Sequence, residues 1–385
     1  MRKLDFIPFS RPSITEEEIK EVMETLKSGW LTTGKKTKEF EEKFKEYIGA
    51  NYAIAVNSAT SGLFLSLKAL GIKEGDEVII PTWTFCATAN VVIHCGATPV
   101  FCDVNEEYLL EPKEIEKKIT KKTKAIIPVH FAGKCCDMDK INEIAQKYNL
   151  YVIEDAAHAC GTIYKGKKVG KDSLICVFSF YPTKNITTGE GGMIVTKEKE
   201  LEEKIRIMAL HGLSLNAYDR YKKHGTWYYE VIYPGFKCNM SDILASIGLC
   251  QLKRIEELIK KREDIVNYYQ ENLKYFNDLI LPQIDVKDQR ISWHLYVIRL
   301  SKTAKINRDK LIEFLREKNI GTSVHFIPLH LHPYYQKTYF LNKEEFPVAN
   351  QLFSSSLSLP LYPDLKKEEL DYIIYSIREA LCLKN

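Results

Sequence analysis

Short apolar segments of strand length alternate with helix-like segments through the first two thirds of the chain. The strand-like segments lack polar–apolar alternation, which is typical of strands buried on both faces. Repeated strand–helix–strand units predict an α/β fold with a mostly parallel sheet and helices on both sides. We expect strands at 52–56, 77–81, 99–103, 123–129 and 150–154, and helices at 61–70, 87–95 and 137–148.

The pattern changes near residue 241. Residues 243–276 carry apolar residues at spacings of three and four, which predicts one long helix. Beyond it we expect strands at 293–298 and 323–326, and helices at 308–318 and 366–381. We interpret the chain as a large domain (1–250) followed by a smaller C-terminal α+β domain (251–385).

Composition excludes several classes of protein. Lys and Arg number 55 against 51 Asp and Glu, and a net charge of +4 over 385 residues is too mild to indicate nucleic-acid binding. No apolar run reaches the roughly 18–20 residues of a membrane helix, and Asp5 and Arg11 interrupt the apolar region that a signal peptide needs. The ten cysteines form no CxxC pair, so we expect free buried thiols in a cytoplasmic protein.

Two local motifs carry weak signals. Residues 161–167 resemble a phosphate-binding P-loop, but Lys168 stands where that motif needs Ser or Thr, so Gly166-Lys167 is interpreted as a hairpin turn. His325, His330 and His332 are closely spaced, yet two prolines interrupt the segment. We therefore expect no metal site there, and interpret the histidines as polar loop residues near a ligand or a subunit contact.

The most informative stretch is residues 151–192. A buried strand ends in Glu154 and Asp155, and the carboxyl ends of parallel strands are where such sheets bind ligands. Lys184 follows an apolar string and precedes the glycine-containing loop 189–192. Partial burial there would lower the pKa of its amine and make it nucleophilic, although taken alone it is more often a solvated loop lysine.

These residues together match the requirements of pyridoxal 5′-phosphate (PLP). Lys184 can form the Schiff base, and Asp155 can keep the pyridine nitrogen protonated. Residues 57–62, between a strand and a helix, can hold the phosphate at a helix N-terminus. An aromatic face for the ring can come from Phe85, or from its neighbour Trp83.

The chain resembles the DegT/StrS-type sugar aminotransferases over nearly its whole length. They are PLP enzymes of the aspartate-aminotransferase fold (fold type I), with a mostly parallel mixed sheet in the large domain and a smaller C-terminal domain. Within this family, the chain most resembles enzymes of spore-coat polysaccharide and of 4-amino-4-deoxy-arabinose biosynthesis. The motifs that carry the resemblance lie at 29–34, 57–60, 75–79, 96–100, 128–130, 154–158, 178–180, 184–185, 189–192 and 234–242.

The resemblance implies roles for particular residues. Lys184 and Asp155 would be catalytic, and His158, where many relatives have Gln, would lie near the 3-hydroxyl of the ring. A related branch of dehydratases has His in place of this lysine, so that activity is disfavoured. Substrate candidates are Arg220, which is equally interpretable as a surface residue of a mobile loop, with His325 and Trp30. The implied cofactor-binding set is Ser58, Thr60, Ser61, Phe85, Asp155, His158, Ser179, Lys184 and, from the other subunit of a homodimer, Asn239.

The resulting hypothesis is a ping-pong transamination for surface polysaccharide or glycan biosynthesis. Glutamate would convert PLP to pyridoxamine 5′-phosphate (PMP), which would aminate a nucleotide-linked keto sugar, most readily a UDP-4-keto-hexose or pentose at C4. Lys184 would move the proton as base and acid. Alternatives are a 3-keto nucleotide sugar or another phosphorylated ketone, a PLP-binding regulator without turnover, and a different PLP reaction on an amino acid. The aromatic residues of the loop 211–233 favour a bulky substrate, or else pack in the core or a dimer interface.

Overall fold

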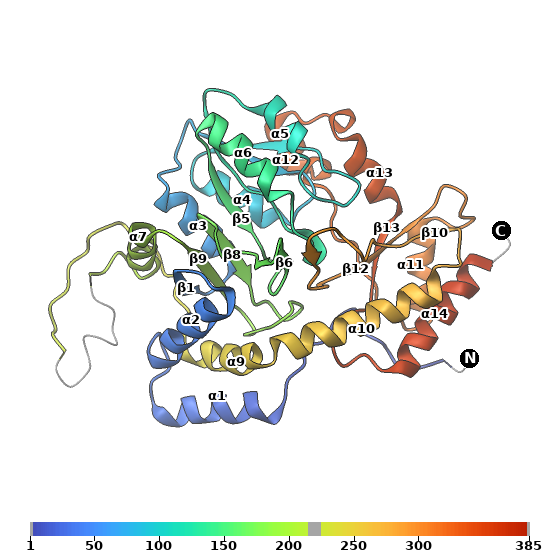
Figure 1. Ribbon diagram of the computed structural model, residues 1–385, viewed down its shortest axis with the longest axis horizontal. Helices are drawn as coiled ribbons and strands as arrows, with labels where there is room; N and C mark the ends of the chain where they lie inside the picture. Colours follow the sequence, from blue (N-terminus) through green and yellow to red (C-terminus); the bar gives the residue numbers. More distant parts are fainter. Residues whose placement is uncertain (1–2, 215–224, 383–385) are drawn as a thin grey trace.

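The computed structural model describes residues 3–214 and 225–382. The chain forms a larger and a smaller lobe, and the long helix α10 (Ile255–Leu273) runs from one to the other (Figure 1). In those residues, no helix is both long and apolar enough to span a membrane.

The larger lobe is built on a seven-stranded sheet in the order β1-β9-β8-β5-β4-β2-β3. Only β9 runs against its neighbours, so the sheet is mixed but mostly parallel, as predicted. The strands are β1 (Tyr52–Val56), β2 (Glu77–Pro81), β3 (Thr98–Cys102), β4 (Thr123–Ile126), β5 (Tyr151–Asp155), β8 (Ile175–Ser179) and β9 (Gly192–Thr196).

Helices cover both faces of this sheet. Consecutive residues of a strand point to opposite faces, and β8 shows the consequence. Val177 lies against Gly62 of α3, where an added Cβ would be 2.7 Å from it. Phe178 instead packs on Phe44 of α2, with ring centroids 5.1 Å apart. The helices of this lobe are α1 (Glu16–Ser28), α2 (Lys35–Ile48), α3 (Ala59–Ala69), α4 (Cys86–His94), α5 (Pro112–Lys118), α6 (Met138–Tyr148), α7 (Lys199–Ala209) and α9 (Asp242–Lys253).

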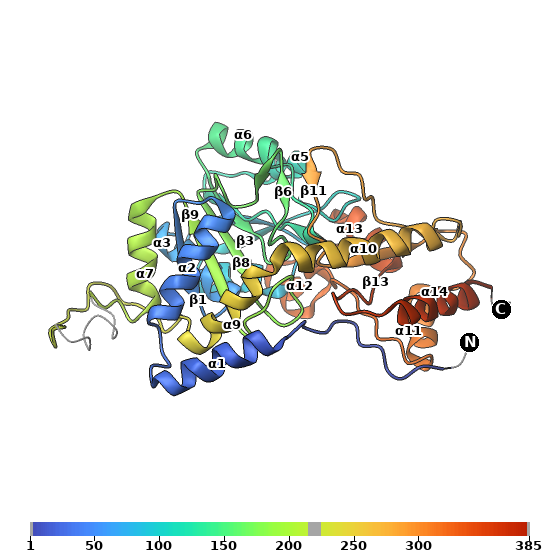
Figure 2. The same ribbon diagram turned by 60° about the horizontal axis from the view of Figure 1, so that its bottom comes forward.

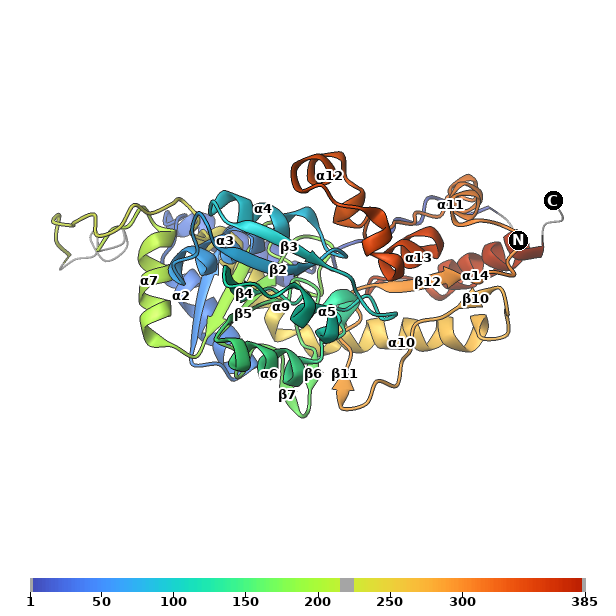
Figure 3. The same cartoon turned by 90° about the horizontal axis from the view of Figure 1, so that it is seen from above.

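The smaller lobe has an antiparallel sheet of β10 (Leu279–Ile280), β12 (Tyr296–Leu300) and β13 (Ser356–Leu359). Seen from above, this sheet lies beside α10 and α14 (Figure 3). Its core is a second hydrophobic cluster that includes Ile298, Ile373 and, from the other end of the chain, Ile7. Buried residues of α12 and α13 belong to the first cluster instead. The remaining helices are α11 (Arg308–Glu317), α12 (Pro333–Tyr339), α13 (Pro347–Ser355) and α14 (Lys367–Cys382).

Three sequence expectations are resolved locally. The helix expected at 243–276 is interrupted at Arg254, which lets α9 pack on α1 and α2 while α10 continues to α14 (Figure 2). The strand expected at 323–326 is wrong, because only Ser323 forms a bridge before the chain turns towards the larger lobe. The hairpin at Gly166 is confirmed: β6 (Ile163–Tyr164) pairs with β7 (Lys167–Lys168), and β11 (Gln289–Arg290) pairs with β6.

Candidate active site

A cavity of about 540 Å³ opens at the carboxyl ends of β5 and β8. Its walls come from both lobes: Asp155 and Lys184 line it from the larger lobe, and His294 and His325 from the smaller. This is the position at which parallel α/β sheets bind ligands.

Asp155 is the last residue of β5 and is buried. Its carboxylate accepts hydrogen bonds from the Ala157 backbone N–H (3.1 Å) and from Thr88 Oγ1 (2.9 Å). Burial raises the pKa of Asp155, although both hydrogen bonds and the nearby Lys184 oppose the rise. A carboxylate fixed in this way can pair with a cation placed in the cavity.

Lys184 lies in the turn after β8, where its backbone N–H donates to the Tyr181 carbonyl (2.9 Å). Burial lowers the pKa of its amine to about 8, and the carboxylate of Asp155 opposes the drop. At pH 7 roughly a tenth of such an amine is unprotonated. Lys184 therefore has the nucleophilic character that an ordinary lysine lacks.

The N-terminus of α3 faces the same cavity. The side chain of Ser58 caps the helix by accepting from the Ser61 backbone N–H (3.1 Å), and Ser58, Thr60 and Ser179 all line the cavity. Gly192 passes so close that an added Cβ would lie 2.6 Å from the backbone N of Ala59. Free N–H groups and the positive end of the helix dipole make this end of the cavity an anion site.

Phe85 and Trp83 differ sharply in position. Phe85 lines the cavity and is 59% exposed, so its ring face is free to cover a ligand. Trp83 is fully buried and packs against Tyr108, with ring centroids 5.0 Å apart. The expectation that Trp83 could supply the aromatic face is therefore wrong, because its side chain belongs to the core.

Three histidines form one wall of the cavity: His158, His294 and His325. Burial lowers the pKa of all three, that of His325 to about 4, and the positive charge of Lys184 adds to the effect. His294 is a cavity residue that the sequence does not predict. It lies in a segment with the apolar pattern of a strand, and no sequence signal shows that this segment lines the same cavity as Lys184.

Two of the expected site residues lie together outside the cavity. Asn239 Nδ2 donates to Thr33 Oγ1 (2.6 Å), and Trp30 Nε1 donates to the Thr33 carbonyl (3.2 Å). Ser61 contributes its backbone N–H to the cap but is not part of the wall. Arg220 lies outside the described residues.

The other histidines of the 325–332 segment have structural partners. His330 Nδ1 bonds with Thr82 Oγ1 (2.7 Å), and its Nε2 bonds with Asn350 Oδ1 (2.9 Å). In the described part of the chain, no three His, Cys, Asp or Glu side chains are grouped as a metal site would require.

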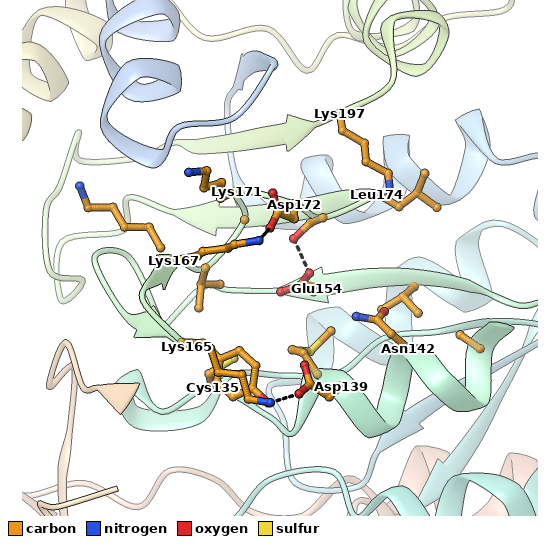
Figure 4. A pocket seen from close by; sticks show the side chains of 18 of the residues that line it. Cys135, Asp139, Asn142, Glu154, Lys165, Lys167, Lys171, Asp172, Leu174 and Lys197 are labelled. Carbon is orange, nitrogen blue, oxygen red and sulfur yellow. Dashed lines mark hydrogen bonds and ion pairs between the residues drawn. The ribbon is translucent and has the colours of Figure 1, made fainter. Parts of the chain in front are cut away.

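A second hollow of about 530 Å³ lies at the opposite, amino ends of β5 and β8 (Figure 4). Two of its lysines pair with acidic residues of the same hollow: Lys165 with Asp139, and Lys167 with Asp172. The side chain of Glu154 points into this second hollow and not into the cavity that Asp155 lines. Its carboxylate accepts a hydrogen bond from Ser173 Oγ and bonds with His130 Nε2 (2.9 Å). Unlike the first cavity, this hollow is lined by the larger lobe alone.

The first cavity fits pyridoxal phosphate. Its amine, Lys184, can react with the aldehyde, and its carboxylate, Asp155, can pair with the pyridinium nitrogen. The N-terminus of α3 can bind the phosphate, and the exposed ring of Phe85 can stack on the cofactor. Together with the mixed sheet of the larger lobe, it defines the class of fold type I PLP-dependent enzymes.

Comparison with known proteins narrows the class. The chain belongs to the DegT/DnrJ/EryC1/StrS aminotransferase family, whose model matches residues 12–378. It is 52% identical over 383 residues to the uncharacterized protein MJ1066 of Methanocaldococcus jannaschii, covering 99% of each chain. It is 49% identical over 379 residues to the spore coat polysaccharide biosynthesis protein SpsC of Bacillus subtilis, covering 98% of this chain and 97% of SpsC.

Solved structures agree with this placement. Spr1654 of Streptococcus pneumoniae, assigned as a sugar aminotransferase, superimposes in its PMP form with a TM-score of 0.91 at 36% identity, over 97% of this chain and 99% of that one. Its PLP form matches equally well. The protein is therefore an aminotransferase, and its family uses pyridoxal phosphate.

Proposed function

We propose that this protein is a cytoplasmic sugar aminotransferase of surface polysaccharide biosynthesis. It moves the amino group of L-glutamate to the C4 keto group of a nucleotide-linked sugar, in first place a UDP-4-keto-hexose or pentose. The likeness to SpsC and Spr1654 supports the sugar and the polysaccharide. The free cysteines, most of them buried, fit a reducing compartment.

One observation carries the proposal: Lys184 and Asp155 share a buried cavity with the start of α3. When bound, pyridoxal phosphate supplies an electron sink that stabilises negative charge at the reacting carbon. Lys184 Nζ, with its pKa near 8, takes up and returns the proton at that carbon close to neutral pH. Asp155 would pair with the pyridinium nitrogen of the bound cofactor and would keep the ring in its electron-withdrawing form.

The other cavity residues bind and orient. Ser58, Thr60 and Ser179 lie where they can bind the phosphate, together with the backbone N–H groups at the start of α3. His158 would face the 3-oxygen of the cofactor, and Phe85 would cover its ring. His325 lines the same cavity from the smaller lobe and would contact the acceptor.

A homodimer with shared active sites is part of the proposal. Residues 225–233, which precede Phe236, form an arm that extends away from the larger lobe (Figure 1), and their aromatic side chains are exposed, Trp227 by 85%. Asn239 follows this arm and lies outside its own cavity. Exposed apolar side chains on such a scale mark an interface, and a second copy of the chain fits the role. Cross-linking or sedimentation at assay concentration would reveal a monomer if this is wrong.

The decisive test uses the purified protein in its PMP form. It is incubated with a panel of nucleotide-linked 4-keto and 3-keto sugars, and the return of the PLP spectrum is recorded. We expect recovery with a UDP-4-keto sugar and none with Lys184→Ala. Recovery only with 3-keto sugars, or only with other phosphorylated ketones, would show that the substrate belongs to that class and not to the 4-keto sugars. No recovery with any ketone, together with no PMP formation from glutamate, would favour a PLP-binding regulator.

A further inference from the structure

His158 and His294 face one another beside the cavity, and each has a ring nitrogen without a partner. Their ring centroids are 4.3 Å apart, with an angle of 49° between the planes. The two side chains are 6% and 3% exposed. In the described residues, neither Nδ1 atom has a hydrogen-bond partner, although buried nitrogens are nearly always paired.

As the rings stand in the structure, a ligand in the cavity does not reach these two atoms. Both Nδ1 atoms are buried away from solvent, and so from whatever fills the cavity. The rings themselves line the cavity, so it is Nε2 of each that can face a ligand. Each Nδ1 therefore has the opposite ring as its available partner. The ring torsion of histidine is soft, so a small rotation changes the separation without moving the backbone.

The backbone of His294 is held from two sides. Its N–H donates to the Ala132 carbonyl (3.2 Å), and its carbonyl accepts from Arg262 Nη1 (3.5 Å). The same guanidinium also reaches the Lys184 carbonyl (3.4 Å) through Nη2. One buried side chain thus links the backbones of His294 and Lys184.

At neutral pH both rings favour the neutral form. Burial lowers their pKa well below the ordinary value, and nearby positive charge adds to this. The groups that face the pair are Lys184 after β8, Arg262 on α10 and His325 in the smaller lobe, with Asp155 as the carboxylate beside Lys184. A neutral imidazole has one N–H and one bare nitrogen, so two neutral rings can satisfy each other.

We propose that His294 is a positioning residue that donates its Nδ1–H to Nδ1 of His158, so that the proton of His158 resides on Nε2. His158 then presents an N–H to the cavity, which suits the anionic 3-oxygen of the cofactor. His294 presents a bare Nε2, which accepts from a hydroxyl or N–H of the substrate. The inference rests on the proposed function for the identity of these ligands, but the pairing itself concerns only the protein.

The pairing is tested first in the full chain without cofactor. Imidazole ¹⁵N–¹H correlation spectra of ¹⁵N-histidine-labelled protein report the tautomer of each of the nine histidines. The signals are assigned by the loss of one set in His158→Gln and one in His294→Asn. We expect the Nδ1–H tautomer for His294 and the Nε2–H tautomer for His158. The opposite tautomer at either residue, or a protonated ring at neutral pH, would overturn the proposal.

The second readout is the pH midpoint of the visible absorbance change of the PLP-loaded protein. His294→Asn keeps an N–H near the Nδ1 position, whereas His294→Gln and His294→Phe lose it. We expect the pH midpoint to rise in His294→Gln and His294→Phe, because a poorly oriented His158 leaves the 3-oxygen more basic. In His294→Asn we expect the midpoint of the unchanged protein. Equal shifts in all three variants would indicate a merely structural role. The exposed His94, changed to Gln, is the matched control.

The two proposals fail separately. The expected tautomers without amino transfer to any sugar would refute only the proposed function. Amino transfer with the wrong tautomers would refute only the pairing.

Discussion

The lowered pKa of Lys184 can be measured directly, without cofactor. With the pKa at about 8, roughly 10% of the amine is unprotonated at pH 7, against about 0.03% for an ordinary lysine, a ratio of ~300. Competitive labelling of the cofactor-free protein with trace acetic anhydride, followed by peptide mass spectrometry, yields the reactivity of each lysine against pH. We expect the labelling of Lys184 to rise with a midpoint near pH 8.

The variant Asp155→Asn tests in which direction the carboxylate shifts the pKa of Lys184. The carboxylate favours the protonated amine, so its removal must move the midpoint of Lys184 below that of the unchanged protein. Lys20, which is exposed, is labelled in the same samples as the internal reference. A midpoint above pH 10 in the unchanged protein, or an upward shift in Asp155→Asn, would refute the idea that burial and this carboxylate control the amine.

Three further changes test the scaffold of the site. Gly192→Ala places a methyl group 2.6 Å from the backbone N of Ala59. We expect the free energy of unfolding in urea to fall by about 1–3 kcal/mol and PLP to bind more weakly in a titration. An unchanged affinity for PLP would contradict the phosphate site. Trp83→Ala empties a fully buried position and should cost about 3–5 kcal/mol, Trp83→Phe clearly less, with an equal loss in both speaking against a packing role. Asp242→Ala removes the carboxylate that accepts four hydrogen bonds from the start of α2. We expect calorimetry to show a free energy of unfolding lower by about 2–3 kcal/mol. Asp242→Asn keeps one oxygen acceptor and should lose less stability.

The sheet could be predicted because its strands are buried on both faces and are therefore continuously apolar. Lys184 and Asp155 could be predicted because each follows such a strand, and the carboxyl ends of parallel strands converge. The phosphate-binding residues around Ser58 could be predicted for a similar reason, because a capping residue shortly after a strand indicates the start of a helix.

Residues that approach from elsewhere could not be predicted in this way. Trp293, next to His294, adopts a left-handed backbone conformation (φ 50°), and the expected strand begins only at Tyr296, so His294 lies in a turn and lines the cavity. Nothing in a strand-like pattern encodes that turn. Trp83 and Phe85 are two residues apart and equally aromatic, and only the packing of Tyr108 shows which of them is enclosed. Periodicity locates elements, whereas the choice between neighbouring side chains depends on tertiary contacts.

The cavity takes residues from Phe9 at one end of the chain to Phe326 towards the other, and Ile7 shares a core with Ile373. During synthesis, a ribosome must therefore release almost the entire polypeptide before the pocket has all its walls. A product truncated before residue 294 would lack two of the three histidines that line the cavity beside Lys184, so we expect the cofactor to bind only to a nearly complete chain.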